Sequence, residues 1–129
     1  MDDIYIIDAD KEHLKELLKE IKLIAKELGI FINDKKTHIV KLSHGFTFLK
    51  IKYSLTESGR IIKRLSRDSV TRERRKLKKY KLLLLNGKIT YKEIYNAYQS
   101  WRGNAIKFNS YKSIQNMNRL FNSLYGEYL

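Results

Sequence analysis

The sequence predicts an α+β fold, in which short antiparallel strands and one helix precede a bundle of three helices. Up to residue 62, short apolar runs and turn residues surround a single amphipathic helical pattern. From Arg67 onward the apolar residues recur with the 3.6-residue period of a helix. The charge changes at the same place: residues 1–62 carry 11 Lys and Arg against 10 Asp and Glu, a net +1, whereas residues 63–129 carry 16 against 4, a net +12. We therefore expect two parts, residues 1–62 and residues 63–129.

The first part is expected to begin with a buried strand at Ile4 to Ile7, where four apolar residues follow one another. A helix of about 18 residues should follow, capped by Asp8 or Asp10 and closed by Gly29, which can adopt the left-handed conformation at a helix end. Its apolar residues have helical spacing. They are Leu14, Leu17, Leu18, Ile21, Ala25 and Leu28.

Further extended segments are predicted after this helix. One strand is expected around residues 38–40 and another over Phe46 to Tyr53. The residues Glu57-Ser58-Gly59 indicate the turn of a hairpin, which returns through Ile61 and Ile62.

The second part is expected to contain three helices. The first begins near Arg67 and is stopped by Asn86-Gly87, and the second begins at Thr90 and ends at Gly103. Thr90 and Glu93, three residues later, form the pattern of a capping box. The third helix begins near Ser110. Apolar residues at helical spacing give each helix one buried face. They are Val70, Leu77, Tyr80 and Leu84; Ile94, Tyr98 and Trp101; and Ile114, Met117, Phe121 and Leu124.

Composition excludes several classes of protein and of site. The chain of 129 residues contains no cysteine, which excludes disulfides and thiolate zinc sites. It contains no apolar run of the roughly 20 residues that span a bilayer, and no leader sequence is evident, so we expect a soluble, cytoplasmic protein. His13, His38 and His44 lack the spacing of metal ligands, and neither a Ser/His/Asp arrangement nor a glycine-rich phosphate loop is present.

The net charge of +13 indicates a polyanionic partner. Eight Lys or Arg lie between residues 72 and 88 with Glu73 as the single acid, a pattern that lacks the mixed charges of an ordinary solvated helix face. The basic residues expected to bind phosphate are Arg72, Arg74, Arg75, Lys76, Lys78 and Lys79. A membrane surface would also attract basic residues, but it favours a helix with one clean apolar face, whereas this segment carries aromatics typical of a bundle core. We therefore expect a nucleic acid and no membrane.

Several short patterns resemble motifs of reverse transcriptases. Asp2-Asp3 followed by Ile4-Tyr5-Ile6-Ile7 resembles the aspartate pair of their palm. Matches to later palm and thumb motifs follow in the same order along the chain. They are Asp10-Lys11-Glu12-His13-Leu14, then Leu28-Gly29, then Asn33, Lys36 and Thr37 of the lysine motif, then Phe46, Phe48 and Leu49 of the primer-gripping motif, and finally Trp101, Gly103, Asn109, Ser110 and Tyr111 of group II intron-type and related bacterial thumbs.

This resemblance implies that residues 1–62 are the C-terminal part of a palm and residues 63–129 a helical thumb of an RNA-directed DNA polymerase. By analogy, Asp2 and Asp3 are catalytic metal ligands for two Mg²⁺ ions. Lys36 would lie near the departing pyrophosphate, with a solvated turn lysine as the alternative. The palm strand that carries the family's other essential aspartate, and the fingers, have no counterpart in these residues. We therefore expect this chain to be inactive alone and to require an upstream palm and fingers portion.

The same resemblance assigns Phe48, Leu49 and Lys50 to a primer grip, although the family usually has glycine where Lys50 stands. A side chain there could block close approach of the backbone or add a phosphate contact. The expected partners are an RNA template and an RNA–DNA duplex. A free-standing RNA-binding module without catalysis, including a maturase-like role in RNA folding, is the alternative that the charge pattern fits equally well.

Overall fold

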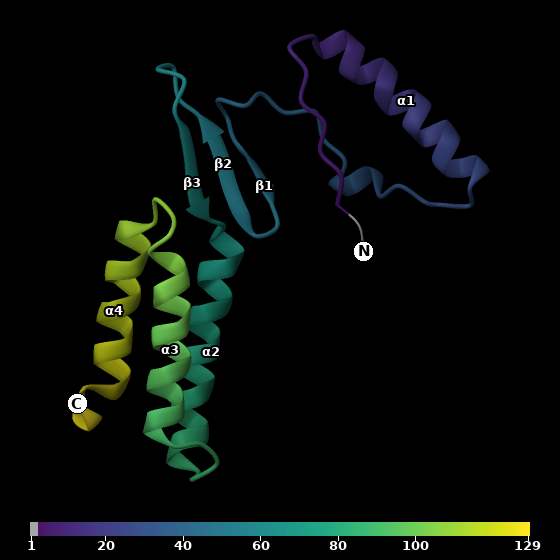
Figure 1. Cartoon of the computed structure of the whole chain (residues 1–129). Coiled ribbons are helices and arrows are strands. Elements are labelled where there is room, and N and C mark those ends of the chain that lie inside the picture. The colour runs from purple at the N-terminus through teal and green to yellow at the C-terminus, as the bar shows by residue number, and fades with distance from the viewer. Residues whose placement is uncertain (1–2) are drawn as a thin grey trace.

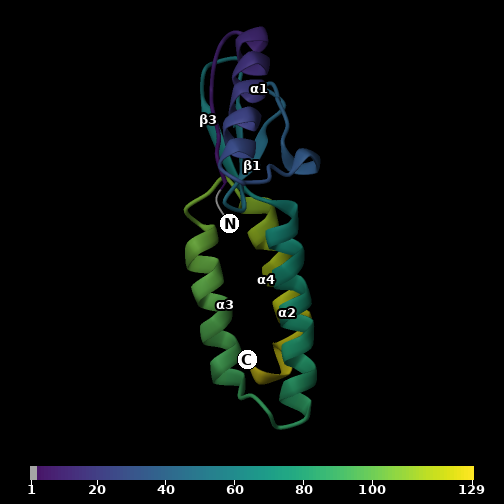
Figure 2. The same ribbon diagram turned by 90° about the vertical axis from the view of Figure 1, so that its right-hand side faces the viewer.

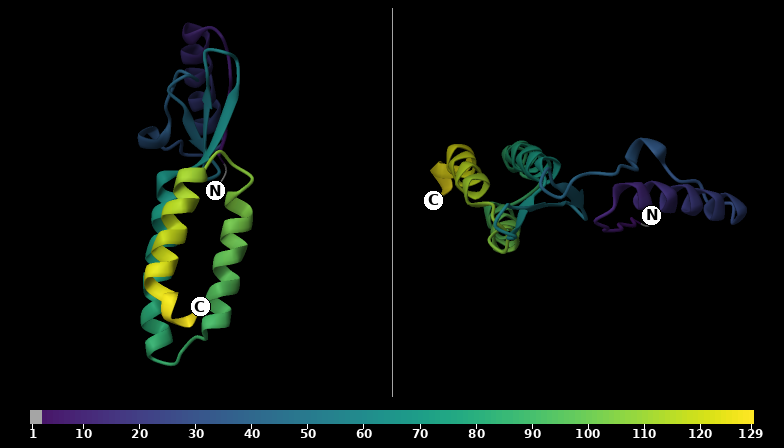
Figure 3. Two further views of the ribbon diagram at one scale, coloured as in Figure 1. Left: turned by 90° about the vertical axis from the view of Figure 1, so that its left-hand side faces the viewer. Right: turned by 90° about the horizontal axis from the view of Figure 1, so that it is seen from above.

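The computed structural model describes residues 3–129 and confirms the α+β class. A three-stranded antiparallel sheet of order β1-β2-β3 lies between one helix and a bundle of three helices (Figure 1). The elements are α1 (Lys11–Glu27), β1 (Phe46–Phe48), β2 (Ile51–Leu55), β3 (Ile61–Leu65), α2 (Arg67–Leu85), α3 (Tyr91–Ala105) and α4 (Tyr111–Tyr125), with 3-10 turns at Asp34–Lys36 and Gly126–Tyr128. Seen from above, α1 and the bundle lie at opposite ends of the molecule (Figure 3).

Helix α1 has the predicted ends. The side chain of Asp10 accepts hydrogen bonds from the backbone N–H groups of Glu12 and His13, which have no partner inside the helix. At the other end Gly29 adopts a φ of 71°, the left-handed conformation expected after a helix. The apolar face of α1 is only partly covered, because Leu14, Leu17, Leu18 and Ile21 are half-buried and Ala25 is its one buried residue, and Leu23 on the opposite face is 63% exposed.

The strands predicted at residues 4–7 and 38–40 are wrong. Neither segment belongs to a strand in the described chain, and Ile4 is 79% exposed. An apolar run becomes a strand only when another strand pairs with its backbone groups, and the described residues supply none here. Tyr5 instead packs across the sheet residues, with its ring centroid 4.8 Å from that of Phe48.

The single strand predicted over Phe46 to Tyr53 is also wrong, because the chain reverses within it. Phe48 pairs with Ile51, so Leu49 and Lys50 form a two-residue hairpin turn between β1 and β2. Their φ angles are 48° and 69°, as a type I′ turn requires. Such turns usually carry Asn or Gly, and the sequence Leu49-Lys50 therefore did not indicate a turn. The next hairpin is as predicted, with Gly59 at a φ of 77°.

The three bundle helices surround the main hydrophobic core of the described chain. Figures 2 and 3 show α4 on one side of the α2–α3 pair. The buried core residues are Leu77, Ile94, Tyr98, Met117, Phe121 and Tyr125. The rings of Tyr98 and Phe121 stack at 4.3 Å, and the hydroxyl of Tyr125 donates to the backbone oxygen of Leu77 at 2.6 Å. The buried faces predicted from helical spacing are thus confirmed at Leu77, Ile94, Tyr98, Met117 and Phe121, whereas Tyr125 was not among the predicted positions.

The helix boundaries in the bundle follow their local signals, with one exception. Asn86 caps the end of α2, and the capping box of Thr90 and Glu93 begins α3. The prediction that Gly103 ends α3 is wrong, because the helix continues to Ala105. Gly103 has a helical conformation here, and a lone glycine weakens a helix without stopping it.

The turn between α3 and α4 joins the bundle to the sheet. Asn109 and Lys63 exchange two hydrogen bonds, from the Asn109 N–H to the Lys63 oxygen at 2.7 Å and from the Lys63 N–H to the Asn109 Oδ1 at 3.2 Å. The buried Ser110 Oγ accepts from the Leu65 N–H at 3.0 Å. The edge of β3 is therefore covered by this turn, and the predicted division at residue 62 falls within β3.

Candidate nucleic-acid interface

Helix α2 places its basic residues on two stripes. Arg72, Arg75, Lys76 and Lys79 have the spacing i, i+3, i+4 and i+7 and therefore share one face. Arg74 and Lys78, spaced by four, lie on another face with Lys81. We call the first set the α3-side stripe, because Lys76 lines the space between α2 and α3. The apolar residues Leu77 and Leu84 lie between the two stripes and face the core.

Most of the predicted phosphate-binding side chains are free to meet a ligand. Arg72, Arg74, Arg75, Lys78 and Lys79 are exposed, and within residues 3–129 none of them forms an ion pair. Lys81, on the other stripe, is engaged by Glu127, and this ion pair raises the pKa of Lys81. The exposed positive charge of α2 therefore has no internal compensation in the described chain, which suits a phosphate backbone.

The predicted grip residues lie beside the start of α2. Leu49 is 67% exposed and Lys50 is exposed, both at the tip of the β1–β2 hairpin, whereas Phe48 is half-buried against Tyr5. The backbone oxygen of Lys50 accepts a hydrogen bond from the N–H of Ser66, the N-cap residue of α2, at 2.9 Å. This hydrogen bond holds the hairpin tip against the N-terminus of the basic helix. Lys50 adopts a left-handed φ of 69°, a conformation that glycine takes without strain.

The predicted catalytic residues are not brought together by the described part of the chain. Asp2 lies outside the described residues, and Asp3 is exposed. Lys36 is exposed at the end of the 3-10 turn Asp34–Lys36, which an ion pair between Lys22 Nζ and Asp34 Oδ1, 2.6 Å apart, ties to α1. Among residues 3–129, no three His, Asp or Glu side chains gather as metal ligands. The described residues do not form a two-Mg²⁺ site by themselves.

Glu73 is a site residue that the sequence pattern did not single out. It is 7% exposed, and its Oε1 has no hydrogen-bond partner among the described residues, while its Oε2 lies 3.8 Å from Lys76 Nζ. Burial raises the pKa of the Glu73 carboxyl, and Lys76 only partly opposes this effect. The signal was present in the sequence, because Glu73 stands at the i+3 position from Val70 and i−4 from Leu77, on the apolar stripe of α2.

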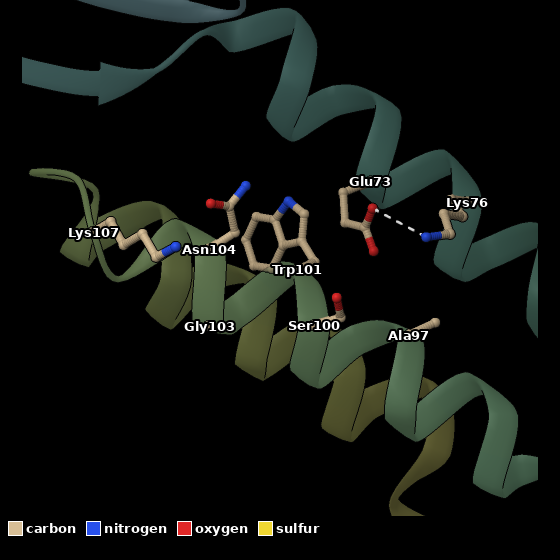
Figure 4. Close-up of a pocket in the computed structure, with 8 residues that line it drawn as sticks. All are labelled: Glu73, Lys76, Ala97, Ser100, Trp101, Gly103, Asn104 and Lys107. Atoms are coloured by element: carbon tan, nitrogen blue, oxygen red, sulfur yellow. Dashed lines mark ion pairs between the residues drawn. The ribbon is translucent and has the colours of Figure 1, made fainter.

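The Glu73 side chain lines a pocket of about 590 Å³ between α2 and α3 (Figure 4). Trp101 of α3 stands in this space, and one face of its indole stacks on Tyr98 at 5.9 Å. Polar groups surround it on the α3 side. The lining residues are Glu73, Lys76, Ala97, Ser100, Trp101, Gly103, Asn104 and Lys107. Trp101 is thus half-buried rather than part of the sealed core.

Comparisons with known proteins gave no match for this chain. No family model matches the chain, and neither the curated proteins nor the solved structures contain a significant match. In the part of the chain that the structure describes, every helix is too short or too polar to cross a bilayer.

Proposed function

We propose that this chain is the C-terminal palm and thumb portion of an RNA-directed DNA polymerase and that it grips a template–primer duplex. One observation carries the proposal: the exposed Lys and Arg of α2 have no ion-pair partner in the described chain, and the N-cap residue of the same helix, Ser66, is hydrogen-bonded to Lys50, in the segment whose motif resembles a primer grip. Lys and Arg bind phosphates without reading bases, which a polymerase needs because it must accept every sequence.

We further propose that catalysis needs an upstream palm and fingers portion. The uncovered apolar surface of the first half supports this, since Ile4 is 79%, Leu28 68% and Phe31 95% exposed, and a chain that stood alone would be expected to bury such residues. The Mg²⁺ site would then combine Asp2 and Asp3 with a carboxylate of that portion, with Lys36 nearby. A cytoplasmic location is part of this proposal.

The binding half of the proposal is tested by titrating the full chain with an RNA–DNA duplex over a series of salt concentrations. A phosphate-gripping surface should lose affinity steeply as salt rises, because bound counterions are released on binding. An affinity that does not change with salt would refute it.

The polymerase half is tested separately by primer extension. The chain alone with magnesium and nucleotides should give no product, and product would contradict the need for an upstream portion. When that portion is supplied, Asp2→Ala should abolish extension. If Asp2→Ala instead left every activity of the assembled protein unchanged, the alternative would stand, a free-standing RNA-binding module or a maturase-like RNA-folding role.

A further inference from the structure

The pocket between α2 and α3 joins a negative group to a positive surface. The buried carboxylate of Glu73 faces into it, and Lys76 and Lys107 lie at its border (Figure 4). Lys76 belongs to the α3-side stripe of α2. Elsewhere on α2 acids are scarce: Asp68 in the first turn is the only other one. An acid next to a phosphate-binding stripe repels phosphate, so its presence needs a separate explanation.

One oxygen of this carboxylate, Oε1, is buried without a hydrogen-bond partner among the described residues. Such a buried acceptor is costly, and a donor from a ligand would relieve that cost. An ionised carboxylate accepts hydrogen bonds only, so the ligand must bring an O–H or N–H group to it. The sugar–phosphate backbone of DNA carries no such donor. The backbone of RNA carries one, the ribose 2′-hydroxyl, which is the group by which proteins distinguish RNA from DNA.

We propose that one RNA strand passes along the pocket between α2 and α3, with its phosphates on the α3-side stripe and the 2′-hydroxyl of one ribose donating to Glu73. Trp101 supplies an aromatic surface beside that nucleotide, of the kind on which sugars and bases pack. The volume of about 590 Å³ lies in the range of ~300–1,000 Å³ usual for ligand sites. This assignment rests on the proposed nucleic-acid grip and adds a preference for an RNA strand.

The test uses ligands that differ only at the 2′ position, so that folding of the protein is not at issue. The full chain is titrated with an oligonucleotide bearing 2′-hydroxyl groups and with its 2′-fluoro counterpart, which keeps the RNA-like sugar shape but has no donor. We expect the hydroxyl form to bind about tenfold more tightly, equivalent to about 1.4 kcal/mol. Equal affinities for the two forms overturn the inference and leave the grip intact.

The protein-side variant is Glu73→Met, which keeps the length of the side chain and removes the acceptor. It should bind the two oligonucleotides equally, because the 2′ preference depends on the carboxylate. Lys79→Gln is the matched control: it should weaken binding of both oligonucleotides by the same factor and leave their ratio unchanged. A 2′ preference that survives in Glu73→Met overturns the assignment of Glu73. If no oligonucleotide binds in a salt-dependent manner, the proposed grip is refuted, and this inference is refuted with it.

Discussion

Neutralising the α3-side stripe of α2 should reduce both the affinity for a nucleic-acid duplex and its dependence on salt. The perturbation is the triple variant Arg72→Gln, Arg75→Gln and Lys79→Gln, which removes three exposed charges that have no ion-pair partner among residues 3–129. Each phosphate contact adds about 0.9 to the slope of log affinity against log salt on a duplex like B-DNA. Three contacts add about 2.7, so a fourfold rise in salt should weaken the unaltered chain roughly 40-fold more than the variant.

The assay is fluorescence anisotropy of a labelled RNA–DNA duplex titrated with each protein at several salt concentrations. A matched control removes the same charge from α1, by Lys11→Gln, Lys19→Gln and Lys26→Gln, all at exposed positions. If a general attraction by the +13 chain were responsible, both triple variants would lower the slope equally. Equal slopes for the two variants, or an unchanged slope for the α2 variant, would refute the assignment of the grip to α2.

Three further predictions concern stability, each followed by urea unfolding of the full chain. Lys50→Gly should raise the free energy of unfolding by about 0.5–1 kcal/mol, because relief of the left-handed strain exceeds the entropy that glycine adds to the unfolded chain; a lower midpoint would contradict this. Ser110→Ala should lower it by about 1–3 kcal/mol by leaving the Leu65 N–H unpaired, and that amide should exchange faster with deuterium, whereas unchanged exchange would rule out the bond. Because the folded pKa of Glu73 is raised above 4.5, the folded chain binds this proton more tightly, and stability falls as pH rises from 4.5 through the folded pKa. Glu73→Gln should remove this fall. The free energy of unfolding of the variant, relative to that of the unaltered chain, should therefore rise across that pH range and then level off. A difference that stays constant with pH would contradict the prediction.

The elements that sequence reasoning found are those whose signals are local. Helices α2, α3 and α4 carry their own apolar period and their own end signals, such as the capping box at Thr90, and a helix satisfies its backbone from within itself. The strands were harder to predict, because the hydrogen bonds that define a strand are made with another segment of the chain. Residues 4–7 had the composition of a strand but no neighbour in the described chain to pair with, and the turn at Leu49-Lys50 lacked the residues that mark one.

The candidate site was predictable to a similar extent. The basic residues of α2 could be named because a helix of known period displays its charges in a known pattern, and five of the six are exposed. The burial of Glu73 depends on how α2 and α3 pack, although its position on the apolar stripe of α2 already indicated a buried side chain. The roles of Asn109 and Ser110 depend on the sheet edge that they cover, which lies more than 40 residues earlier in the chain.

The hydrogen bonds that connect the sheet to the bundle explain how the hairpin tip can contact α2 although the first half of the chain buries little apolar surface. The contacts that hold it are backbone hydrogen bonds, from Ser66 to Lys50 and from Asn109 to Lys63, together with the short side chain of Ser110. None of them involves α1. The placement of the tip against α2 is therefore independent of whatever covers α1. If an upstream portion covers the exposed apolar residues Ile4, Leu28 and Phe31 and completes catalysis, the grip on nucleic acid should be present without it, whereas polymerisation should not.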